Sequence, residues 1–137
     1  MNEIYNNLTK LIKEANTIIF MTHRNMDLDG FGASLCMYEI AKSFNKECYI
    51  FINSKKNHKS VEKAFLKLKE EKIDINYIDC HSYKKILETD PTLIILDIHK
   101  PNIVEYPKIL DEVKKIIVID HHIKDHSYIK NTSLSYI

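Results

Sequence analysis

The chain has 137 residues, 45% of them hydrophobic, which suffices for one domain with its own core and is too few for two ordinary domains. Its 20 basic and 19 acidic residues give a formal net charge of +1, which excludes a general attraction to long nucleic acids or to acidic membranes. Phosphate binding must therefore be local, and Arg24 is the only arginine that can clamp a phosphate with two hydrogen bonds.

Apolar residues recur at helical and strand spacings in alternation along the chain. In chain order they predict a helix over 4–14, a strand over 17–22, a helix over 30–44, a strand over 48–52, a helix from Ser60 through Leu68, a strand over 75–78, a helix over 82–89, a strand over 92–96, a helix over 107–113 and a strand over 115–119. Such alternation indicates a parallel sheet that helices cover on both faces. We predict one α/β domain with a mainly parallel, doubly wound sheet of about five strands, joined by right-handed crossovers.

The cysteines and the lack of export signals indicate the compartment. Cys36, Cys48 and Cys80 are widely spaced and form no CxxC pair, which favours free thiols in a reducing compartment over zinc ligands. No apolar run approaches the roughly 20 residues of a membrane span, and the polar N-terminus does not resemble a signal peptide. We expect a cytoplasmic protein, or the cytosolic part of a membrane-anchored one.

Acidic and imidazole side chains follow three of the predicted strands. The candidates are His23, Asp27 and Asp29 after the first strand, Asp97 and His99 after "TLIIL", and Asp120, His121 and His122 after "KIIVI". Because open parallel sheets bind ligands beyond the carboxyl ends of their strands, we expect these groups to meet in one site.

Each of these strand endings alone has an ordinary structural explanation. Asp29 can cap the helix that follows it, Asp97 can be a solvated loop residue, and His121 and His122 can be surface histidines. Taken together, carboxylates and imidazoles without thiolates suit Mn²⁺, Mg²⁺, Fe²⁺ or Co²⁺ better than a structural zinc ion. Five candidate ligands suggest two ions, about 3.5–4 Å apart, that share a carboxylate and promote attack on a phosphoryl group.

Three segments carry a resemblance to a known family. "HRNMDLDGFGASL", "LIILDIHKP" and "IIVIDHH" resemble the first three motifs of the DHH phosphoesterases, over about residues 16–124. The tetrad "HKPN" that begins at His99 is most similar to the GdpP-type cyclic di-AMP phosphodiesterases, in which Asp–Thr–His–Arg/Lys–Pro is typical. Other members are RecJ-type nucleases, oligoribonucleases and manganese pyrophosphatases.

The resemblance implies a set of metal ligands. His23 and Asp27 would hold one manganese ion, Asp29 and His121 would hold the other, and Asp97 would bridge the two. A water shared by the ions, with its pKa lowered by their charge, would be the in-line nucleophile.

The resemblance also implies roles for residues around the ions. His122 and Asp120 are the expected catalytic residues: His122 would donate to a substrate phosphate oxygen, and Asp120 would steady its neighbours from behind. His99 and Lys100 are expected substrate contacts beside the site, with solvated loop residues as the alternative.

The first motif needs a particular turn to supply both ions. We expect an extended Asp–Leu–Asp segment, in which Asp27 and Asp29 diverge to one ion each and Leu28 faces the core. Gly30 and Gly32 would let the next helix start close to the ions, with its N-terminal dipole near the phosphate; a simple tight turn is the alternative.

The chain departs from the family pattern in three respects. It ends at Ile137 before a fourth-motif aspartate, and Asp125, the only acid after the triplet, lies too near the triplet to match it. We do not expect the family's second, substrate-binding domain within residues 1–137, and Ile123 stands where GdpP-like sequences usually have a basic residue. We expect residues 1–137 to be one DHH-type domain, incomplete at its C-terminal end, with weakened metal binding.

Two classes of function therefore remain open. The first is manganese-dependent hydrolysis of cyclic di-AMP or a short linear dinucleotide. Within this class, the alternative activities are those of an oligoribonuclease, a phosphoadenosine-phosphate phosphatase or a pyrophosphatase. The second is a metal- or nucleotide-binding fragment without turnover. The expected partner is a small nucleotide, not a long nucleic acid, and a homodimer is left open.

Overall fold

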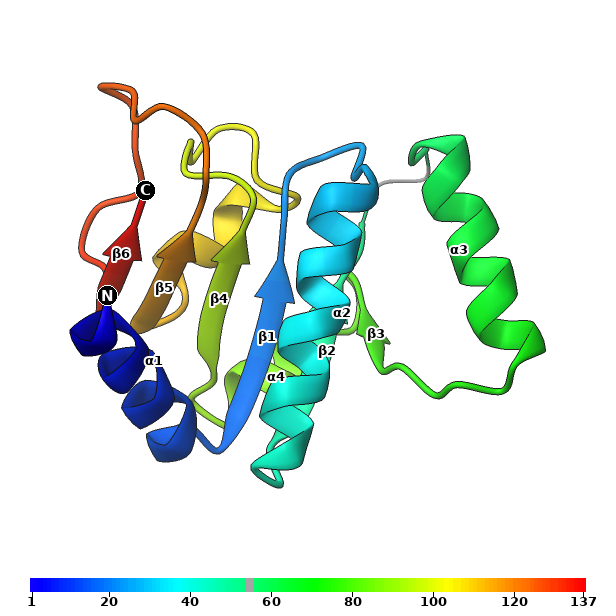
Figure 1. Ribbon diagram of the computed structural model, residues 1–137, viewed down its shortest axis with the longest axis horizontal. Coiled ribbons are helices and arrows are strands. Elements are labelled where there is room, and N and C mark those ends of the chain that lie inside the picture. The colour runs from blue at the N-terminus through cyan, green and yellow to red at the C-terminus, as the bar shows by residue number, and fades with distance from the viewer. Residues whose placement is uncertain (54–55) are drawn as a thin grey trace.

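The computed structural model describes residues 1–53 and 56–137 and shows one sheet with helices packed on it (Figure 1). The helices are α1 Asn2–Glu14, α2 Leu28–Ser43, α3 Lys59–Glu70, α4 Lys84–Leu87 and the 3₁₀ helix η1 Pro107–Asp111. The strands are β1 Thr17–Met21, β2 Glu47–Phe51, β3 Tyr77–Ile78, β4 Thr92–Leu96, β5 Lys115–Ile119 and β6 Leu134–Tyr136.

The sheet is parallel throughout, in the order β3-β2-β1-β4-β5-β6. This confirms the predicted α/β class and parallel sheet, with one strand more than expected. The sixth strand was missed because its residues are Leu134, Ser135 and Tyr136, of which only Leu134 is half-buried. The helix predicted over 107–113 is a short 3₁₀ helix that begins at Pro107, a residue without a backbone N–H.

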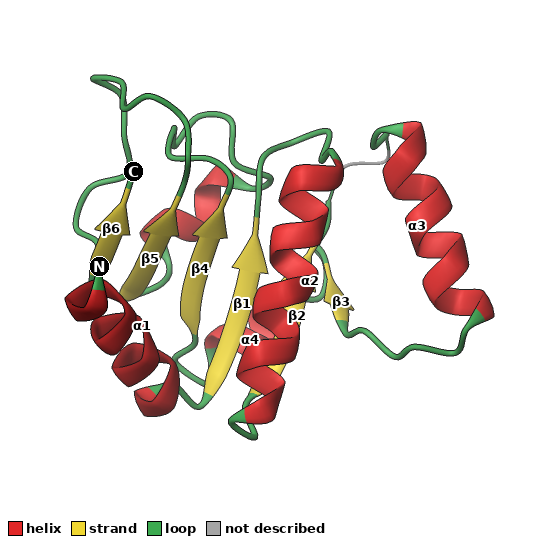
Figure 2. Cartoon of the chain, viewed as in Figure 1, coloured by secondary structure: helices red, strands yellow, loops and turns green. Residues whose placement is uncertain are grey.

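Helices cover both faces of the sheet (Figure 2). On one face, Ile18, Phe20 and Ile94 pack with Ile12 of α1 and Tyr38 of α2. The opposite face carries Ile19, Met21, Leu93 and Ile95, which pack with Tyr83, Ile109 and Ile129. All five residues of β1 and of β4 are buried, which explains why these strands are continuously apolar in sequence.

The order of the strands places the three motifs together. The chain builds β1–β2–β3 to one side of β1 and then returns to add β4, β5 and β6 on the other side. β1 and β4 are therefore neighbours at the topological switch point, where open α/β sheets bind ligands, and β5 lies next to β4. Among the described residues, none of the helices is long and apolar enough to cross a membrane.

Candidate metal centre

The loops that follow β1 and β4 are tied together by backbone hydrogen bonds. The N–H of Glu105 donates to the carbonyl of Thr22 (2.8 Å), and the N–H of Arg24 donates to the carbonyl of Ile103 (3.0 Å). His23 and Val104 form an isolated antiparallel bridge between the same two loops. The first motif is therefore held against the loop that begins at Asp97.

Asp97 lies at the centre of the convergent side chains and is 7% exposed. Its Oδ1 is 2.9 Å from Nε2 of His121, and its Oδ2 is 3.8 Å from Nε2 of His23. The same nitrogen of His23 is 3.6 Å from Oδ1 of Asp27. Side chains from the ends of β1, β4 and β5 thus meet at one carboxylate.

Two overlapping groups of the described residues can hold a metal ion. One consists of His23, Asp27 and Asp97, and the other of Asp97, Asp120, His121 and His122; within each group the ligand atoms lie within 4.8 Å of one another. Asp97 belongs to both groups. The donors are carboxylate oxygens and imidazole nitrogens without a thiolate, a set that fits hard or borderline divalent cations such as Mn²⁺.

The electrostatics of the carboxylates also favour a cation. Burial, together with the nearby charge of Asp27, raises the pKa of Asp97, and this outweighs the hydrogen bond from His121. Burial also opposes ionisation of Asp27, but the hydrogen bond from the Gly30 N–H and the charges of His23 and His58 lower its pKa overall. A bound cation would relieve the repulsion between the two carboxylates.

The turn of the first motif differs from the extended segment that we expected. Helix α2 already begins at Leu28, which is 50% exposed instead of facing the core. Asp27 is the N-cap residue, and its Oδ1 accepts a hydrogen bond from the N–H of Gly30 (3.0 Å). The residue that caps α2 is thus Asp27 and not Asp29. The two carboxylates are separated because Asp27 precedes the helix and Asp29 lies in its first turn, and not because side chains alternate along an extended segment.

Asp29 stays outside both groups of ligand atoms. It is exposed in the first turn of α2 and lines a neighbouring cavity of about 430 Å³ with Asp97, Asp120 and His121. Its side chain therefore borders the second group without joining it, and its ligand role remains a prediction.

Asp120 lies behind the histidines of the third motif and is 4% exposed. Its Oδ1 accepts hydrogen bonds from the backbone N–H groups of His121 (2.8 Å) and His122 (3.3 Å), and it lies 2.7 Å from Nδ1 of His122. Its Oδ2 lies 2.5 Å from Nδ1 of His99. Burial works against the charge of Asp120, but the hydrogen bonds from His99 and His122 lower its pKa below the ordinary value.

His99 and Lys100, the expected substrate contacts, both have partners within the protein. His99 is 1% exposed, with its ring between Asp120 and the backbone of Asp125, so its nitrogens do not face the solvent. Both ring nitrogens thus have partners within the protein, although His99 also lines the cavity at the ligands, and its contact with a substrate stays a prediction. Lys100 is partly exposed and forms an ion pair with Asp125 at 2.8 Å.

A cavity of about 530 Å³ opens at the first group of ligands. It is lined by His23, Asp27, Asp97, Ile98, His99, Lys100, Ile103, Asp120, His122 and Ile123. The side chain of Ile123 is 95% exposed, so the residue after the triplet offers an apolar rim where a basic one was usual in the resembled family.

His58 is a neighbour of the site that the sequence did not reveal. It is the N-cap residue of α3, its N–H donates to the carbonyl of Met26 (3.3 Å), and its charge contributes to the lowered pKa of Asp27. It follows β2 and belongs to none of the three motifs, so the strand-end pattern carried no signal for it.

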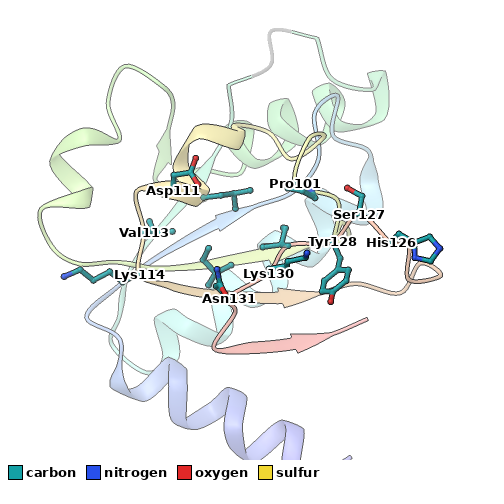
Figure 3. A pocket seen from close by; sticks show the side chains of 12 residues that line it. Pro101, Asp111, Val113, Lys114, His126, Ser127, Tyr128, Lys130 and Asn131 are labelled. Atoms are coloured by element: carbon teal, nitrogen blue, oxygen red, sulfur yellow. The ribbon is translucent and has the colours of Figure 1, made fainter.

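A larger cavity, about 680 Å³, lies apart from both ligand groups (Figure 3). It is bordered by residues near η1, such as Asp111 and Lys114, and by the segment 126–131 that leads to β6. None of the proposed metal ligands lines it, so cavity size alone would have pointed away from the convergent carboxylates.

His122 should titrate above its ordinary pKa of 6.5 in the metal-free protein, because Asp120 accepts a hydrogen bond from its ring and burial opposes this only in part. Since the folded state favours the protonated ring, this stabilisation is complete below pH 6.5 and is lost as the pH rises through the folded-state pKa. An NMR titration of the ring protons measures the value, and Asp120→Asn should bring it back towards 6.5. A wild-type midpoint at or below 6.5 would contradict the assigned hydrogen bond.

Comparison with known proteins identifies the fold and the family. An exopolyphosphatase-related protein from Bacteroides fragilis has the same fold, with a TM-score of 0.70 and 21% identity over 99% of this chain and 38% of that one. Cyclic-di-AMP phosphodiesterase GdpP of Bacillus subtilis is 28% identical over 131 residues, and cyclic-di-AMP phosphodiesterase PdeA of Listeria monocytogenes is 25% identical over 131 residues. Each of these two matches covers 95% of this chain and 20% of the relative, so the chain spans about one fifth of their length. Residues 17–137 match the sequence model described as "DHH family, N-terminal domain", which confirms the resemblance carried by the three motifs, and the chain belongs to the DHH family.

Proposed function

We propose that this chain is the metal-binding domain of a manganese-dependent phosphodiesterase that hydrolyses a cyclic or short linear dinucleotide, with cyclic di-AMP favoured. The observation that carries the proposal is the position of Asp97 in both groups of candidate ligands. The names of the two relatives support the choice of substrate. A small dinucleotide is also compatible with a cavity of about 530 Å³ at the ligands.

In this proposal His23, Asp27 and Asp97 hold one ion, and Asp97, His121 and Asp29 hold the other. Two bound dications would supply an activated water and neutralise charge on the reacting phosphoryl group. Asp27 has a second task, because as the N-cap of α2 it fixes the helix N-terminus next to the site, where the positive end of the helix dipole would favour a substrate phosphate. The buried carboxylate of Asp97 resists ionisation, and a cation on either side favours its charged form.

His122 and Lys100 act on the substrate. Because Nδ1 of His122 is paired with Asp120, its other ring nitrogen is the one available in the cavity, and in the protonated ring it would donate to a phosphate oxygen. Lys100 lines the same cavity. When it leaves its ion pair with Asp125 and binds a substrate phosphate, it balances the phosphate charge. The side chains of Ile103 and Ile123 form an apolar wall for the rest of the nucleotide.

The proposal includes a cytosolic location. Cys36, Cys48 and Cys80 are free thiols in the structure, as a reducing compartment would keep them. We take residues 1–137 as a single domain that acts on a small nucleotide, either as the cytosolic part of a membrane-anchored protein or as a cytoplasmic protein.

The test is a panel of substrates with Mn²⁺. The chain is incubated separately with cyclic di-AMP, pApA, a phosphoadenosine phosphate and pyrophosphate, and the products are separated by chromatography, with Asp97→Asn as the inactive control. We expect linear dinucleotide from cyclic di-AMP in the wild type only. If pyrophosphate were the only substrate cleaved, the chain would instead be a pyrophosphatase.

A domain that binds metal and nucleotide without turnover is the second candidate. It is favoured by Asp29, which lies outside the second group of ligand atoms; of the ligands that the family resemblance implies for the second ion, that group contains Asp97 and His121. Stoichiometric Mn²⁺ binding in calorimetry, together with no product from any substrate of the panel, would select this candidate.

A further inference from the structure

His99 connects the loop after β4 to the loop after β5 at three points. Its Nδ1 lies 2.5 Å from Oδ2 of Asp120, and its Nε2 accepts a hydrogen bond from the N–H of Asp125 at 3.2 Å. Its backbone carbonyl accepts a hydrogen bond from the N–H of Ile129 at 2.8 Å. The side chain is buried, so these contacts replace water.

The contact with Asp125 determines the tautomer of the His99 ring. An Nε2 that accepts a hydrogen bond from a backbone N–H carries no proton, so the proton of the neutral imidazole is on Nδ1. His99 is therefore the donor and Asp120 the acceptor in their short contact. A neutral donor satisfies Oδ2 of Asp120 and leaves its Oδ1 free for other partners.

The other oxygen of Asp120 holds the third motif in place. Oδ1 receives the backbone N–H groups of His121 and His122 and faces Nδ1 of the His122 ring. If Oδ2 lost its donor, a buried carboxylate oxygen would be left without a partner, and the carboxylate would rotate to regain one. His121 and His122 would then lose their orientation towards Asp97.

We propose that His99 is a positioning residue that acts through Asp120 to orient His121 and His122 at the second group of ligands. The role in hydrolysis rests on the proposed function, whereas the effects on metal affinity and on the His122 tautomer do not require turnover. Partners behind metal ligands typically contribute about 10–100-fold to metal affinity, and we expect an effect in that range.

Two substitutions of similar size separate the hydrogen bond to Asp120 from mere packing. In His99→Asn the amide nitrogen takes the place of Nδ1 and keeps a donor for Asp120. In His99→Gln the amide reaches the place of Nε2, near the N–H of Asp125, and leaves Oδ2 of Asp120 without a partner. His126→Asn, at an exposed histidine of the loop after β5, is the matched control.

Calorimetry with Mn²⁺ on the full chain measures the first effect. We expect His99→Gln to lose about 10–100-fold in affinity, and His99→Asn and His126→Asn to stay near the wild type. The ¹⁵N shifts of the His122 ring in metal-free protein give a second readout. Protonated Nδ1 should persist in His99→Asn and be lost in His99→Gln.

The wild type itself provides a test if both variants fold poorly. Its own His99 ring should show a protonated Nδ1 and an unprotonated Nε2 in ¹⁵N NMR. The opposite tautomer, or equal Mn²⁺ affinities for His99→Asn and His99→Gln, would overturn the proposal. Absence of hydrolysis with the expected affinity difference would refute the proposed function and leave the role of His99 standing.

Discussion

Replacing Asp97 with Asn is expected to weaken Mn²⁺ binding at both ligand groups together. Asp97 is the residue that the two groups share, and its oxygens face His121 on one side and His23 on the other. We expect a loss of more than about 100-fold, because residues behind the ligands already contribute about 10–100-fold. Asp27→Asn should weaken chiefly the group that contains His23.

Asparagine is a better replacement than alanine at position 97 for a backbone reason. Asp97 has a φ of 62°, in the left-handed region that Asn and Asp tolerate more readily than other residues with a side chain. Alanine would add backbone strain to the loss of the ligand and confuse the two effects. Asn at position 27 likewise keeps the N-cap of α2, because Asn caps helices as well as Asp does.

The metal-free Asp97→Asn protein should be at least as stable as the wild type. The pKa of Asp97 is raised in the folded state, so the ionised carboxylate costs stability at neutral pH, and a neutral amide removes that cost. The wild type should gain stability as Mn²⁺ is added, and the variant should not.

Calorimetry and thermal unfolding with and without Mn²⁺ measure both effects, and Asp74→Asn, at an exposed loop residue, is the control. Equal and small heats for wild type, Asp27→Asn and Asp97→Asn would show that Asp97 is not a shared ligand.

The continuous apolar strands are the reason that the site was predictable. β1, β4 and β5 are short apolar runs, and each ends in a candidate ligand, so the rule for parallel sheets was enough to place His23, Asp97 and His121 together. These three residues do meet in the structure. The order of the strands makes this possible, because β1, β4 and β5 are consecutive neighbours in the sheet.

The parts that could not be predicted depend on tertiary contacts. A histidine in a loop looks the same in sequence whether it is exposed or buried, and the burial of His99 depends on contacts with a later part of the chain, among them Asp120 and Asp125. The start of α2 at Leu28 follows from the cap formed by Asp27, whereas we expected an extended Asp–Leu–Asp segment there. β6 pairs with β5 although its three residues lack an apolar run.

Gly30 is the position in the first motif where a single methyl group should have a large effect. A Cβ at Gly30 would lie 2.5 Å from Oγ1, 3.2 Å from Cβ and 3.3 Å from Cγ2 of Thr22. Thr22 directly follows β1 and is 1% exposed, so its side chain has little room to move. Because two other atoms of Thr22 are also close, rotation of the threonine side chain would not remove the clash.

We therefore expect Gly30→Ala to lower the free energy of unfolding by about 1–3 kcal/mol, the usual cost of overpacking. The displaced helix would also carry Asp27 away, because the N–H of Gly30 is the donor to its carboxylate, so Mn²⁺ affinity should fall as well. Gly32→Ala is the matched control: a Cβ there meets nothing within 4 Å, and alanine in a helix should raise the free energy of unfolding by about 0.5–1 kcal/mol.

A second substitution tests whether the clash is the cause. Thr22→Ala removes Oγ1 and Cγ2, and the lost hydroxyl has no hydrogen-bond partner among the described residues. The double variant Thr22→Ala/Gly30→Ala should therefore regain most of the stability and Mn²⁺ affinity that Gly30→Ala loses, relative to Thr22→Ala alone. Chemical denaturation of the four proteins measures the coupling free energy. Additive effects would mean that the cost of Gly30→Ala does not come from the close approach of α2 to Thr22 at the end of β1.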